Sequence, residues 1–186
     1  MITPTVSSAA AMGELQPPPP ATAQLEVLPP FFAVSRKKLV VMMLCSFNFY
    51  AVFWFYMNWR RIRDREPGIN PALRSLLAAI FCYPCFARIQ RHGRAMGLSL
   101  GLHAAPAAIL WVLLQLMGQF ESPLWWVPLL AVLPMVPIQS LANAINAREV
   151  PAHERNDRFS GWNWLLLLAG GGTLMLAVLG ALIPGT

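Results

Sequence analysis

Basic residues are absent from two long stretches of this chain, and their segregation constrains the fold more than any other feature. All fourteen Lys and Arg lie outside 95–147 and 159–186. More than half of the residues are hydrophobic, and 12% are charged, against about 25% in soluble domains. A water-soluble fold cannot hide that apolar surplus, so the pattern indicates an integral membrane protein.

Three apolar runs are long enough to cross a hydrocarbon core of about 30 Å, which needs roughly 20 helical residues. They cover approximately 96–118, 124–145 and 161–183. Gly118 and Ser122-Pro123 separate the first two runs, and we expect a tight helical hairpin there because glycine ends helices and proline begins them.

Basic residues predict the orientation of these runs. The segment 148–158 carries three arginines, whereas the hairpin tip carries only Glu121. Because basic loops stay in the cytoplasm, we expect 148–158 inside the cell and the hairpin tip and C-terminus outside. The basic residues before the first run agree with this orientation: Arg88, Arg91 and Arg94.

The run 39–59 has the length of a span, but basic clusters flank both of its ends. These clusters are Arg36, Lys37 and Lys38 on one side and Arg60, Arg61, Arg63 and Arg65 on the other. A spanning helix would leave one cluster on the translocated side. A re-entrant hairpin that turns at Ser46-Phe47-Asn48 keeps both in the cytoplasm, so we favour it over a fourth spanning helix.

The expected fold is an all-α, membrane-embedded helical bundle in one domain over 36–186. It contains three spanning helices, the re-entrant or fourth spanning segment, and a short interfacial helix. The interfacial helix is expected at 75–87, because this apolar run is too short to span.

Residues 1–35 are expected to form a disordered tail. They include Pro17 to Pro20, Pro29 and Pro30 among many small residues, a composition that buries too little apolar surface to order itself. A plain spacer is favoured over a polyproline II ligand. No apolar signal-peptide core precedes Arg36, so we expect the N-terminus to be retained.

Several segments resemble an uncharacterised family of small bacterial multi-pass membrane proteins. The resemblance is carried by VSRKKL (34–39), YAVFWFYMNW (50–59), IFCY (80–83) and NDRFSGWN (156–163), and it covers most of 31–165. Relatives tend to have a glycine-containing turn where this chain has Ser46-Phe47-Asn48. The resemblance implies a bacterial inner-membrane location, and it supplies no catalytic residues, because no activity is assigned to the family.

Cys82 and Cys85 form a CxxC pair, the spacing at which two thiols form a disulfide or bind a soft metal. A zinc site would need two further ligands, and His92 is the one nearby candidate. No thioredoxin-like alternation of strands and helices surrounds the pair. Simple packing of two thiols in an apolar helix is therefore the favoured interpretation.

His103 falls inside the first predicted span, where an ionisable residue is a candidate for function because burying its charge is costly. A neutral imidazole bonded to a neighbouring helix is the favoured interpretation over proton or ion transfer. No Asp or Glu lies within the predicted spans to complete a relay.

Gln139, Asn143 and Asn146 are spaced four and three apart, so their amides share one face at the cytoplasmic end of the second run. They are expected to bond to neighbouring helices, and the alternative is that they line a polar vestibule. The prolines of this run could bend it in the way that helices lining transporter sites are bent.

Small residues at a spacing of four suggest helix contact faces within one molecule or in a homo-oligomer. They are Gly97, Gly101, Ala104 and Ala108 in the first run, and Ala169, Thr173, Ala177 and Ala181 in the third. We expect a structural or partner-binding membrane subunit whose basic surface meets anionic lipid or an acidic partner, with a small transporter or channel as the alternative. No enzyme activity, cofactor, metal site or nucleic-acid partner is predicted.

Overall fold

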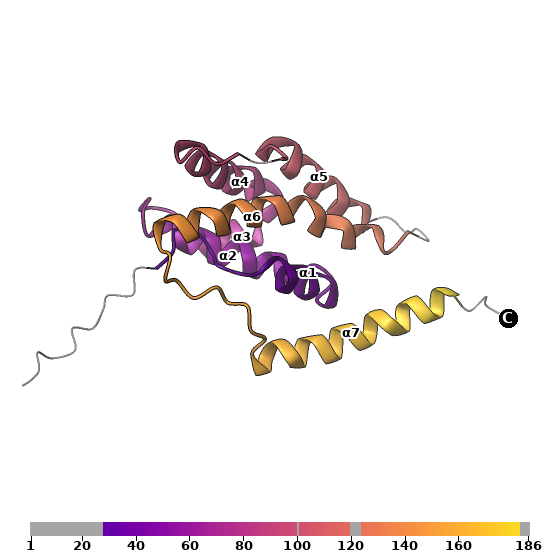
Figure 1. Cartoon of the computed structure of the whole chain (residues 1–186). Helices are drawn as coiled ribbons and strands as arrows, with labels where there is room; N and C mark the ends of the chain where they lie inside the picture. The colour runs from indigo at the N-terminus through magenta and orange to yellow at the C-terminus, as the bar shows by residue number, and fades with distance from the viewer. Residues whose placement is uncertain (1–27, 100, 120–123, 183–186) are drawn as a thin grey trace, which may run out of the picture.

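Helices make up the ordered structure of the chain (Figure 1). The computed structural model describes residues 28–99, 101–119 and 124–182, and these contain no strand. The elements are α1 (Arg36–Cys45), α2 (Phe49–Arg63), α3 (Pro71–Leu76), α4 (Ala78–Ala95), α5 (Ala104–Met117), the 3₁₀ helix η1 (Val127–Ala131), α6 (Val132–Glu149) and α7 (Gly161–Leu182). The all-α prediction is confirmed.

Within the described residues, two helical stretches are long and apolar enough to cross a membrane, not the three expected. They are 127–149, formed by η1 with α6, and α7. The run 96–118 is not one helix, because Gly97 turns the chain with φ +71° and α5 begins only at Ala104. α5 has 14 residues, about 21 Å, which is short of a full crossing.

Residues 39–59 do not form one continuous helix. α1 ends at Cys45, the chain turns through Ser46-Phe47-Asn48, and α2 begins at Phe49. Phe47 and Asn48 have φ of +48° and +69°, in the left-handed region that glycine enters most readily. A glycine-containing turn would therefore satisfy this backbone with less strain.

The two arms of this turn return to the same end of the bundle. Phe32, before α1, donates its backbone N–H to Asn58 Oδ1 near the end of α2 at 3.2 Å. The Arg65 guanidinium lies 4.8 Å from the ring centroid of Phe31. The segment thus folds as a helical hairpin, which is the geometry that the re-entrant interpretation requires.

The apolar run 75–87 is divided between two helices. α3 ends at Leu76, Leu77 adopts a non-helical conformation, and α4 continues past the run to Ala95. α4 is therefore longer than the short helix expected. Large apolar side chains are exposed along α3 and the start of α4, as suits a membrane interface: Leu73, Leu76, Leu77, Ile80 and Tyr83.

Aromatic rings from α2, α4 and α5 form the centre of the core. Trp54, Phe55, Phe86 and Trp111 pack with ring centroids 5.1 to 6.0 Å apart. Trp59 is fully buried between the guanidinium groups of Arg74 at 4.5 Å and Arg88 at 5.4 Å. These contacts lock α2, α3 and α4 together and hold cations against ring faces.

The basic segments converge at one end of the bundle. Arg88 of α4 forms an ion pair with Glu66 just after α2, at 2.9 Å, and its hydrogen bond holds the pKa of Glu66 below the usual value. Arg148 at the end of α6 donates to the Met96 carbonyl after α4, at 2.7 Å. We call this region, formed by residues 28–38, 60–66, 88–96 and 148–158, the basic end.

α7 lies apart from the bundle and contacts it through α1 (Figure 1). None of its described residues is buried. Gly170 crosses α1 so closely that a Cβ there would overlap the Cys45 carbonyl, whereas a Cβ at Gly172 would meet nothing. The predicted face of Ala169, Thr173, Ala177 and Ala181 is therefore not the one that meets α1, since Ala169, Thr173 and Ala181 are exposed.

We predict that Gly170→Ala weakens the packing of α7 on α1 and lowers the thermal stability of the detergent-solubilised protein. The added methyl group needs space that the Cys45 backbone occupies. Gly172→Ala is the matched control, and it should leave the stability unchanged or raise it by up to about 1 kcal/mol through helix propensity. Equal melting temperatures for the two variants would contradict the crossing.

Candidate functional site

Residues 31–34 run in an irregular, extended path through the bundle before α1. All four side chains, from Phe31 to Val34, are buried. They belong to the N-terminal tail that was predicted to be disordered. A buried segment without secondary structure needs partners for its backbone N–H and C=O groups. Residues 1–27 of the predicted tail lie outside the described residues.

Amide side chains supply those partners. Asn146 pairs with both backbone groups of Phe31, accepting from the N–H at 3.1 Å and donating to the C=O at 2.9 Å. Asn58 accepts from the Phe32 N–H. Gln139 Nε2 donates to the Phe32 C=O at 3.0 Å, and Asn143 Nδ2 donates to the Val34 C=O at 2.9 Å.

The amides also bond to one another and to the core. Gln139 Oε1 accepts from Trp54 Nε1 at 2.6 Å, and its Nε2 also donates to Asn143 Oδ1 at 2.8 Å. The structure thus brings the predicted residues Gln139, Asn143 and Asn146 together in one network. They hold an extended segment of the same chain, a partner that their helical spacing alone did not reveal. We call the four amides, including Asn58, the amide clamp.

Cys82 and Cys85 lie on the inner face of α4 as free, buried thiols. Cys82 Sγ donates to the Ala79 carbonyl at 3.6 Å. Among the described residues, no group of three or more His, Cys, Asp or Glu is placed to hold a metal ion. The structure therefore adds no ligand to this pair.

His103 does not lie inside a membrane-spanning helix. It precedes α5 as its N-cap residue and is exposed at the basic end. Its Nδ1 lies 2.9 Å from Gln90 Nε2 and 3.1 Å from Arg94 Nη2, two donors from α4. The correction follows from the late start of α5, which leaves His103 in the preceding turn.

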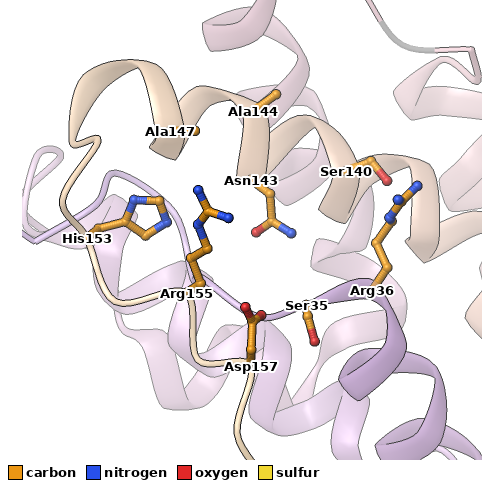
Figure 2. Close-up of a pocket in the computed structure, with 9 residues that line it drawn as sticks. All are labelled: Ser35, Arg36, Ser140, Asn143, Ala144, Ala147, His153, Arg155 and Asp157. Carbon is orange, nitrogen blue, oxygen red and sulfur yellow. The ribbon is translucent and has the colours of Figure 1, made fainter.

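A pocket of about 520 Å³ opens between α1, α6 and the segment 150–160 (Figure 2). Figure 2 shows Arg36 and Arg155 on opposite sides of Asn143. The lining residues are Ser35, Arg36, Ser140, Asn143, Ala144, Ala147, His153, Arg155 and Asp157. Of the predicted site residues, Asn143 lines this pocket. The charged lining residues Arg36, Arg155 and Asp157 were not among the predicted ones.

The buried Lys38 fixes the segment that forms one wall of this pocket. Its Nζ donates to Asn156 Oδ1 at 2.8 Å and to the Arg158 carbonyl at 2.6 Å. Burial lowers the pKa of this ammonium, and the nearby Asp157 and Glu154 charges oppose that effect. Lys38 therefore joins α1 to the chain that leads into α7.

The pocket and the amide clamp share Asn143, which lines the pocket and also donates to the Val34 carbonyl. Comparisons of the chain with protein-family models, with curated proteins and with solved structures found no match. The functional proposal is therefore based on the residues of these two sites.

We predict that Asn146→Leu destabilises the protein, because it leaves the buried N–H and C=O of Phe31 without their partner. The cost is roughly 1–3 kcal/mol for each of these two groups. Thermal unfolding followed by tryptophan fluorescence in detergent measures it. Gln119→Leu is the control, since this exposed glutamine forms no side-chain hydrogen bond within the described residues; an equal shift in both variants would contradict the clamp.

Proposed function

We propose that the chain is a multi-pass bacterial inner-membrane protein that acts as a structural or partner-binding subunit, with its basic end in the cytoplasm. One observation carries the proposal: four basic segments, far apart in the sequence, meet at one end of the helices. Basic residues are retained on the cytoplasmic side of inner membranes, so this end faces the cytoplasm.

The register of α1 against α7 supports a re-entrant α1–α2 hairpin. Lys38 contacts the chain just before α7 begins, and Cys45 meets Gly170 near the middle of α7. α7 has 22 residues, about 33 Å, and can cross a bilayer. When α7 spans, the turn after Cys45 therefore lies near the bilayer midplane, from which α2 returns.

The side chains of Asn48 and Phe49 at that turn bear on its position within the membrane. Asn48 Nδ2 donates to Gln115 Oε1 at 3.2 Å and to the Pro128 carbonyl at 2.6 Å. These bonds satisfy the Asn48 amide N–H groups, as a hydrocarbon environment requires, whereas its buried Oδ1 accepts no hydrogen bond from the described residues. Phe49 beside it is 79% exposed, as a lipid-facing side chain would be.

The finer topology that we propose has three crossings. They are α5, η1 with α6, and α7. The bilayer can thin locally around a helix as short as α5. Exposed Trp162 and Trp164, at the start of α7, would then lie at the inner interface.

The partner-binding role follows from what this arrangement presents to the cytoplasm. Exposed arginines and lysines lie in the segments that form the basic end. Such a surface attracts anionic lipid and acidic protein segments. The transporter alternative was based on the prolines of the second run and on His103 within a span. His103 instead precedes α5 as its N-cap residue, and Pro137 lies inside α6.

We predict the sidedness of three single cysteines in a variant whose native cysteines are replaced by alanine: Leu28→Cys, Ala152→Cys and a cysteine added after Thr186. A membrane-impermeant thiol reagent applied to intact cells should label the C-terminal cysteine alone. All three should react after permeabilisation, which is the control for reactivity. Labelling of Leu28→Cys in intact cells would mean that 39–59 crosses the membrane and would contradict the proposal.

A further inference from the structure

The pocket at the basic end contains two guanidinium groups that form no ion pair with the described residues. Arg63 and Arg88 form ion pairs with Asp64 and Glu66. Arg36 and Arg155 form none with the described residues, although both line the pocket. Two unpaired guanidinium groups on opposite sides of one cavity are suited to bind the oxygens of a phosphate.

The start of α1 adds further donors to the same pocket. Ser35 caps the helix, accepting from the Lys38 N–H through its side chain, and it lines the cavity together with Arg36. The N–H groups between them, of Arg36 and Lys37, have no partner in the helix. Together with the helix dipole, these groups favour an anion. The N-terminus of α1 and the guanidinium groups therefore both favour a negatively charged ligand group.

Asp157 adds a negative charge to the pocket, which suits a cationic ligand group. Its carboxylate lines the cavity and forms no ion pair with the described residues. A simple anion would be repelled by it, whereas a ligand with both a phosphate and an ammonium group satisfies the arginines and the carboxylate together. Ethanolamine phospholipids carry this pair of groups.

The level of the pocket also matches a lipid headgroup. It lies at the start of α1, beside the segment that leads into α7. Exposed Trp162 and Trp164, at the start of α7, suit the interface between headgroups and acyl chains. The pocket volume of about 520 Å³ has room for a phosphoethanolamine group.

We propose that this pocket binds the headgroup of an ethanolamine phospholipid, with its phosphate between Arg36 and Arg155 and its ammonium group at Asp157. The inference rests on the proposed membrane placement of the basic end. The site would hold one lipid of the cytoplasmic leaflet against α1, α6 and the 150–160 segment.

Native mass spectrometry of the full-length protein in detergent tests this directly, with phosphatidylethanolamine and phosphatidylglycerol of identical acyl chains as probes. The protein should retain one ethanolamine lipid in preference to the glycerol lipid. Arg36→Gln with Arg155→Gln should weaken that binding about tenfold for each arginine removed. Arg60→Gln with Arg91→Gln removes the same charge from exposed positions outside the pocket and should leave the affinity unchanged.

Asp157→Asn separates the two halves of the proposal, because it should abolish the preference for ethanolamine while the phosphate is still bound. Glycerophosphoethanolamine should compete with the lipid; competition by inorganic phosphate of equal strength would instead identify a free-phosphate site. Equal affinities in the pocket and control variants would overturn the proposal. Because this measurement is made in detergent, it fails or succeeds independently of the cysteine-labelling result.

Discussion

The amide clamp on residues 31–34 is the interaction on which the rest of the structure depends. A buried, irregular backbone must be satisfied, and Asn58 of α2 and Asn146 of α6 do so for adjacent residues of one segment. The clamp therefore brings the end of α2 and the end of α6 to the place where α1 begins. These contacts fold the α1–α2 segment into a hairpin and bring the basic residues to one end of the bundle.

Composition and charge predicted the helical class, the span at α7 and the turn in 39–59, because these features are set by local residues. The interruption of the helix within 96–118 could not be predicted in the same way. Gly97 and the residues before Ala104 are apolar enough to continue a span, yet a left-handed glycine ends that path. Hydropathy measures the preference for lipid, but it does not measure whether the backbone stays helical.

The candidate site was predicted in part. Gln139, Asn143 and Asn146 stood out because amides on one face of an apolar helix need partners, but the partner is a segment whose composition favoured disorder. Asn58, within an aromatic helix, offered the same signal. The pocket residues Arg36 and Arg155 could not be paired from sequence, since the contacts of Lys38 with Asn156 and Arg158 bring their segments together.

Charge and packing are the basis of the arrangement that we propose, in which the basic end faces water and the turn after α1 lies within the bilayer. The depth of that turn tests the account most directly. A nitroxide at Phe49→Cys in proteoliposomes reports it through its accessibility to oxygen and to a water-soluble nickel complex. The account predicts high oxygen and low nickel accessibility, as at a nitroxide placed at Gly172; high nickel accessibility at Phe49 would place the turn in water and contradict a re-entrant hairpin.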